Sequence, residues 1–288
     1  MENMTEKIKI LVDSGSDISK DYCKKYNIDV VPLNVLYNKK SHKDFYEIDP
    51  VSYCEYLETC KEIPTTSQPS PADFVNYFNK FKDEYDHIIC ITMAPAGSGT
   101  FNSANLAKEM FKENDEQCQI HIVDSRSCGL NETVLAKATA KMIAKGKDVY
   151  TILSELEEMS HNMCTYYLVD NIEFLIKGGR VSTLKGAIAS KLRLKPIVTI
   201  RQGIGSNLTN AVGFHNGLEK LVNYFFQDAD ESTTAYISHA NCYTKALALA
   251  DKLKTRQPQI KIKIFQMNCV MATQSGPGSL GLFFKKIK

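Results

Sequence analysis

Four short loops rich in hydroxyl groups or glycine contain the residues best suited to bind a ligand. These loops are Asp13-Ser14-Gly15-Ser16, Thr65-Thr66-Ser67, Gly97-Ser98-Gly99-Thr100 and Asp124-Ser125. Ligands of an open α/β sheet bind outside the carboxyl ends of its strands, where these loops are expected. Two of the loops lead into predicted helices, whose free N–H groups and positive dipole end favour an anion. The leading candidates for binding this anion are Thr66 and Ser98. Their neighbours Ser67, Gly97 and Thr100 complete the predicted site.

One basic residue, Arg180, stands beside a pair of glycines in Ile176-Lys177-Gly178-Gly179-Arg180. It can bind the same anion, or it can satisfy carbonyl groups at the end of a helix. Ser14 and Ser70 are likewise open to a structural interpretation, because serine is a preferred residue at the start of a helix. Asp13 and Asp17 are expected to stabilise their own turn and helix cap.

The sequence contains little that matches a known catalytic motif. The loop at 97–100 lacks the spacing and the lysine of a phosphate-binding P-loop, and it does not continue as the glycine pattern of dinucleotide-binding proteins. A serine hydrolase requires a G-x-S-x-G turn with a histidine and an acid. An alternative of this hydrolase or acyl-transfer type uses Ser98 as the nucleophile, with His239 or His215 as the base and Asp13 as the acid.

The pattern of hydrophobic residues predicts an α/β fold of two lobes. Residues 1–160 alternate strands and helices, which favours a mainly parallel sheet with helices on both faces. Its strands are predicted at 8–12, 30–36, 87–93 and 120–123, and its helices at 22–26, 71–81, 100–111 and 132–144. Residues 161–288 are expected to form a second α/β domain. Its strands are predicted at 165–169, 196–200, 233–238 and 260–265, its helices at 172–176, 216–226 and 243–254, and a tight turn at 274–278 before a last strand.

Composition narrows the range of partners. A formal net charge of +2 gives no reason to expect binding to nucleic acid or to an anionic membrane. No apolar run approaches the roughly 18 residues of a membrane span, so stable membrane insertion is not expected. The first residues are acidic and no signal-peptide pattern follows them, which predicts a cytoplasmic protein. The nine cysteines include no C-x-x-C pair, so we expect reduced thiols and no metal site.

Seven motifs together resemble those of the DegV family of fatty-acid-binding proteins. In chain order they are Asp13-Ser14-Gly15-Ser16-Asp17, Val31-Pro32-Leu33, Thr66-Ser67-Gln68-Pro69-Ser70, Ser98-Gly99-Thr100 with Asn102-Ser103-Ala104, Val123-Asp124-Ser125, Lys177-Gly178-Gly179-Arg180 and Gly276-Pro277-Gly278. Each motif alone is weak, but their order from residue 8 to the C-terminus is specific.

The resemblance implies a non-enzymatic carrier with a long-chain fatty acid as its ligand and no other cofactor. It also implies that Thr66 and Ser98 hold the carboxylate and that the loaded protein can serve a separate fatty acid kinase. A carrier for another apolar anion, such as an isoprenoid, remains an alternative. Chain length, saturation and oligomeric state are not determined by the sequence.

Three positions depart from the family's pattern. Ala94-Pro95 replaces a pair of serines before the S-G-T loop. Gln274, which we count among the predicted ligand-binding residues, stands where the family commonly has a histidine ahead of its last G-P-G turn. The stretch 210–214 contains no arginine, although the family usually has one there. Because the missing groups could face a phosphate, these departures weaken the expectation of a kinase partner, while fatty-acid binding by Thr66 and Ser98 is unaffected.

Overall fold

The computed structural model describes residues 6–112, 117–181 and 194–287. A four-stranded parallel sheet forms the centre of the N-terminal lobe, with strand order β2-β1-β6-β7. The strands are β1 (Ile8–Asp13), β2 (Ile28–Val31), β6 (His87–Thr92) and β7 (Gln119–Asp124). Every residue of β1 and β6 is buried, as expected for parallel strands that are covered on both faces.

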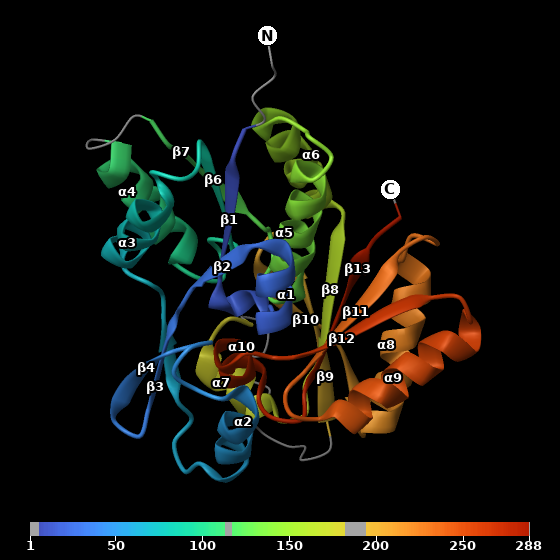
Figure 1. Cartoon of the computed structure of the whole chain (residues 1–288). Helices are drawn as coiled ribbons and strands as arrows, with labels where there is room; N and C mark the ends of the chain where they lie inside the picture. The colour runs from blue at the N-terminus through green and yellow to red at the C-terminus, as the bar shows by residue number, and fades with distance from the viewer. Residues whose placement is uncertain (1–5, 113–116, 182–193, 288) are drawn as a thin grey trace.

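Helices cover both faces of this sheet (Figure 1). On one face lie α1 (Lys20–Tyr26), α5 (Leu130–Ile143) and α6 (Val149–His161), which pack on the isoleucine and valine side chains of β1, β2 and β6. On the other face lie α3 (Pro71–Phe81) and α4 (Thr100–Lys112), which bury Phe74, Phe78 and Phe111. The predicted mainly parallel sheet with helices on both faces is confirmed.

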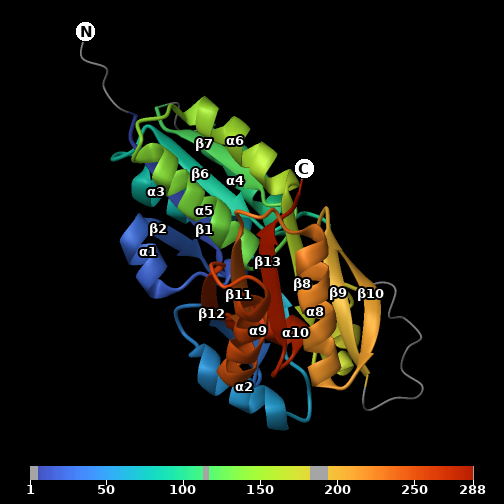
Figure 2. The same cartoon turned by 90° about the vertical axis from the view of Figure 1, so that its right-hand side faces the viewer.

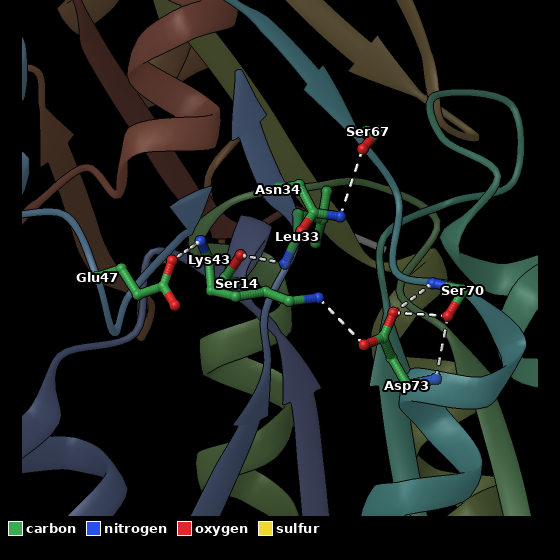
Figure 3. A network of polar contacts seen from close by, with 8 residues as sticks. All are labelled: Ser14, Leu33, Asn34, Lys43, Glu47, Ser67, Ser70 and Asp73. Carbon is green, nitrogen blue, oxygen red and sulfur yellow. Dashed lines mark hydrogen bonds and ion pairs between the residues drawn. The ribbon is translucent and has the colours of Figure 1, made fainter. Parts of the chain in front are cut away.

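The two serines with a structural interpretation have different roles. Ser70 begins α3 as predicted, because its Oγ accepts from Asp73 N and the Asp73 carboxylate accepts from Ser70 N in a capping box. Ser14 is not the capping residue of a helix, so that interpretation is wrong. Its Oγ accepts from the backbone N–H of Leu33 at 3.0 Å, and it is Asp13 that caps the short helix η1 (Ser14–Ser16). Figure 3 shows both serines with these partners.

A small antiparallel sheet of order β4-β3-β5 extends the N-terminal lobe. It contains β3 (Asn34–Tyr37), β4 (Lys40–Lys43) and β5 (Thr65–Ser67). Helix α2 (Pro50–Thr59) lies between β4 and β5 in the chain. The extended run predicted at 30–36 is therefore two strands in different sheets, because Pro32 cannot donate to a ladder and the chain leaves the parallel sheet there. The predicted loop at 65–67 is a short strand, in which Thr66 lies opposite Val35.

A mixed six-stranded sheet of order β10-β9-β8-β13-β11-β12 forms the second lobe. Its strands are β8 (Met163–Leu168), β9 (Leu194–Arg201), β10 (Ile204–Val212), β11 (Thr234–His239), β12 (Lys261–Gln266) and β13 (Leu280–Lys285). Helices α8 (Phe214–Asp228) and α9 (Tyr243–Arg256) cover its outer face (Figure 2). The predicted second α/β domain is thus confirmed as a fold, and the proposed division at residue 160 falls in the last turn of α6.

Two helices fill the space between the inner face of this sheet and α2 (Figure 1). They are α7 (Ile172–Gly178) and α10 (Cys269–Ser275). The turn predicted at 274–278 is partly wrong, because Gln274 and Ser275 end α10 and the turn begins only at Gly276, which has a positive φ of 81°. Gln274 therefore has a helical backbone, and its direction is set by the packing of α10.

Candidate functional site

A mainly apolar pocket lies between the two lobes. It comprises about 820 Å³ of space not occupied by protein atoms, a volume that includes open solvent at its mouth. Its walls come from the ends of β2, β6 and β9 and from α7 and α10. The apolar lining residues are Leu33, Met93, Leu175, Val181, Val198, Ile200, Val270 and Met271. A pocket with this lining suits an apolar chain.

The polar lining of the same pocket contains five of the residues predicted from the sequence. They are Thr66, Gly97, Ser98, Arg180 and Gln274. Gln274 Nε2 donates to Thr66 Oγ1 at 3.0 Å, which joins α10 to β5. The Gln274 amide oxygen is buried and has no hydrogen-bond partner among the described residues. The pocket therefore combines an apolar interior with hydroxyl and amide groups and one cation, Arg180.

The loop before α4 positions Ser98. Its hydroxyl lies 2.8 Å from that of Thr100, and Thr100 N donates to Ser98 Oγ at 3.3 Å. The backbone N–H groups of Gly97 and Ser98 both donate to the Ala94 carbonyl, which closes the loop into a tight turn. Thr100 is fully buried at the start of α4 and is not part of the pocket wall. It contacts the site only through Ser98.

Ser67, the remaining predicted residue, points away from the pocket. It is exposed, and its hydroxyl accepts from Asn34 Nδ2 at 3.4 Å across the small sheet (Figure 3). This orientation follows from the alternation of side chains along a strand, since Thr66 and Ser67 are neighbours in β5 and must face opposite sides. The assignment of these residues to a strand was the step that sequence reasoning missed.

Arg180 lies at the exposed rim. Its Nη1 donates to the Gly178 carbonyl at 2.6 Å, at the end of α7, and Gly179 adopts the left-handed conformation with a φ of 69°. Arg180 therefore has the helix-end role that the sequence offered as an alternative. It also lines the pocket. Arg180 is thus available to an anion at the mouth while its side chain is held by the helix end.

The groups proposed for a serine hydrolase do not converge. Ser98 contacts Thr100, and among the described residues no histidine or acid is hydrogen-bonded to it. His239 accepts from Cys242 N at 3.3 Å, and burial lowers its pKa to about 4. Asp13 is fully buried and accepts from the backbone N–H groups of Gly15 and Met93, and burial raises its pKa to about 6.

Buried carboxyl groups beneath the pocket were not recognised as a group from the sequence. Asp44 accepts from Cys269 N at 3.1 Å and from Val270 N at 3.3 Å, while Asp17 accepts from Asn268 N at 2.9 Å. These bonds fix the first turn of α10, the helix that presents Gln274. Burial raises the pKa of both carboxyl groups. Asp17 could have been singled out from its glycine-rich loop, but nothing around Asp44 in the sequence marks it.

Within residues 6–112, 117–181 and 194–287, no group of histidine, cysteine and acidic side chains is arranged to hold a metal ion. No helix within them is both long and apolar enough to span a membrane. All nine cysteines are free thiols, as predicted.

Comparison with known proteins gives a family for this fold and pocket. The family model of "Uncharacterised protein, DegV family" matches residues 7–286. A DegV domain-containing protein of Clostridium acetobutylicum is 32% identical over 285 residues, which cover 98% of this chain and 100% of that protein. The match thus includes every strand and helix of both lobes.

Solved structures give the same result. A DegV family protein of Thermus thermophilus, reported to bind fatty acid, superposes with a TM-score of 0.89 at 25% identity and covers 98% of this chain and 100% of its own. DegV of Bacillus subtilis, a fatty acid binding protein, gives 0.87 at 26% identity, with 98% and 100% coverage. The resemblance found in the sequence motifs is confirmed, and this chain belongs to the DegV family.

Proposed function

We propose that this protein binds and carries one long-chain fatty acid, with the tail in the apolar pocket and the carboxylate beside Thr66 and Ser98. The observation that most supports the proposal is the placement of both hydroxyl groups in the wall of one apolar pocket, although they are distant in sequence. The relatives of Thermus thermophilus and Bacillus subtilis, which have the same fold, are fatty-acid binders.

The hydrogen bonds around the two hydroxyl groups leave them able to donate. Thr66 Oγ1 accepts from Gln274 Nε2, so its own proton is free for a carboxylate. Ser98 Oγ accepts from Thr100 N and lies 2.8 Å from Thr100 Oγ1; with the Thr100 hydroxyl as the donor in that contact, the Ser98 proton is available to a carboxylate. Arg180 adds positive charge at the rim. These groups offer donors to an anion without burying a cation, whose desolvation is costly.

Burial of the tail is expected to dominate the affinity. About 14 methylenes of a sixteen-carbon acid contribute roughly 11 kcal/mol if they are fully buried. Loss of translational and rotational freedom on association opposes this by about 4–15 kcal/mol. Each charge-assisted hydrogen bond to the head adds only about 1.5–3 kcal/mol. The hydroxyl groups therefore fix which end of the ligand lies at the polar wall.

We propose a carrier that works in the cytoplasm and has no catalytic activity of its own. The absence of a base or acid bonded to Ser98 in the described residues supports this over the acyl-transfer alternative. A fatty acid kinase is a proposed partner, but we expect this chain to be a poor substrate carrier for it. Gln274 provides no positive charge, and no arginine occurs at 210–214 to compensate.

Titration with free fatty acids of different length tests the proposal. Delipidated protein is expected to bind palmitate or oleate tightly and octanoate far more weakly, because each methylene removed costs about 0.8 kcal/mol. Calorimetry measures both affinities. Equal affinity for all lengths would mean that the tail does not enter the pocket, and preference for an isoprenoid acid over palmitate would favour the alternative ligand class.

A further inference from the structure

A second cavity opens beside the start of β8 and the end of β9. It is distinct from the apolar pocket between the lobes, which we call the acyl pocket. It comprises about 1560 Å³ of space that is continuous with solvent, and its wall is mainly polar. It shares Ser127 and Ile200 with the acyl pocket and otherwise has its own lining. The ends of α6, α8 and β13 complete the wall. Apart from these two shared residues, its lining has no part in the function proposed above.

Three cations lie around this cavity. They are Arg126, Arg201 and Lys286, and none of them has an ion-pair partner within the described part of the chain. Asp228 is the single acidic side chain of the lining, and it already accepts a hydrogen bond from Tyr166 OH. The cavity therefore has an excess of positive charge. Two of its three cations are arginines, whose side chains are suited to bidentate recognition of phosphate.

The floor of the cavity is a buried network of hydroxyl and amide groups. Thr165 Oγ1 accepts from Asn131 Nδ2 at 2.7 Å and lies 2.9 Å from Ser127 Oγ. All three residues are at most 5% exposed, and so is Thr199, which also lines the cavity. The other amide atom of Asn131, its Oδ1, is buried and has no partner among the described residues. The hydroxyl groups of this network, with that of Thr199, give the floor its hydrogen-bonding capacity.

We propose that this cavity binds a small phosphate monoester that also contains hydroxyl groups. The arginines and the lysine at the rim bind the phosphate, and Thr199 on the floor binds a hydroxyl group of the ligand. Neither phenylalanine nor tyrosine lines the cavity among the described residues, so a stacked nucleobase is not favoured. The burial of the floor residues favours a free molecule over a phosphate at a membrane surface.

The test is calorimetric titration of the full chain at low salt with glycerol 3-phosphate, inorganic phosphate and glycerol as separate probes. We expect glycerol 3-phosphate to bind in a saturable manner and more tightly than inorganic phosphate. The double variant Arg201→Gln/Lys286→Gln is expected to weaken it about tenfold or more, since two charge-assisted contacts are lost. Lys285→Gln is the control, because Lys285 lies outside the cavity wall near Asp230.

A floor variant separates recognition of the hydroxyl groups from attraction of charge. Thr199→Val is expected to lower the affinity for glycerol 3-phosphate until it equals the affinity for inorganic phosphate. The affinity for inorganic phosphate itself should not change. Retained palmitate binding and an unchanged circular dichroism spectrum show that each variant is folded. The proposal is overturned if wild type does not bind glycerol 3-phosphate, if the double variant binds it equally well, or if only vesicles containing phosphatidic acid bind.

Discussion

Gln274 Nε2 donates to Thr66 Oγ1 at 3.0 Å, and this bond links two residues that are 208 positions apart. Thr66 belongs to the small sheet of the N-terminal lobe, whereas Gln274 ends α10 of the second lobe. Each residue also lines the acyl pocket. The polar wall of the pocket is therefore assembled from both lobes, and neither contains it alone.

Removal of either hydroxyl group is expected to weaken fatty-acid binding. Thr66→Ala and Ser98→Ala each delete one charge-assisted bond worth about 1.5–3 kcal/mol, so the dissociation constant should rise about ten- to a hundredfold. Ser67→Ala is the matched control, because Ser67 is adjacent in sequence but exposed outside the pocket. Calorimetry with palmitate measures all three. Wild-type affinity in both pocket variants would place the carboxylate elsewhere, with Arg180 the next candidate.

A methyl group added at Gly178 is expected to displace Gln274. An ideal Cβ at Gly178 lies 2.3 Å from Gln274 Oε1, closer than real contacts allow. The amide must then move, and its bond to Thr66 is lost or lengthened. Because the contacted atom is the end of a flexible side chain, we expect Gly178→Ala to change the free energy of unfolding by no more than about 1 kcal/mol and to weaken palmitate binding.

A double-mutant cycle isolates this contact. In a Gln274→Ala background the clash disappears, so Gly178→Ala should have a much smaller effect on palmitate binding. Chemical denaturation and palmitate titration of the four proteins give the coupling energy. Additive effects would show that Gly178 and Gln274 do not act on each other.

The sequence predicted the parallel sheet well because its strands are continuous apolar runs, and β1 and β6 are in fact wholly buried. It also predicted α3, since Ser70, Pro71 and Asp73 form a complete start signal within four residues. These features depend on local chemistry, which a sequence contains directly.

The small sheet and α10 could not be predicted in the same way. The three residues of β5 show no alternation long enough to recognise, and they are a strand only because β3 lies beside them. The first turn of α10 is fixed by Asp44, more than 200 positions away in the chain. The motifs marked Thr66 and Gln274 as site residues, but their hydrogen bond depends on this long-range packing.

Replacement of Gln274 by histidine is expected to improve service to a fatty acid kinase. A glutamine amide can donate a hydrogen bond but cannot place positive charge near a developing acyl phosphate, whereas a histidine can. Loaded wild type and Gln274→His are mixed with a kinase that acts on other DegV proteins, and acyl-phosphate formation from ATP is measured. The variant should be faster. Equal turnover, at the level of a relative with the usual histidine, would show that the departure at 274 is neutral.

The central claim is that the apolar pocket between the lobes holds a fatty-acid tail, and the most direct measurement is mass spectrometry of lipid extracted from the purified protein. A buried tail should dissociate slowly, so the account predicts one carboxylic acid per chain with about sixteen to eighteen carbons, a length that gives the tail burial estimated above. The same extraction after exchange with excess oleate should recover oleate. No lipid in the purified protein and none retained after incubation with palmitate or oleate would contradict the account.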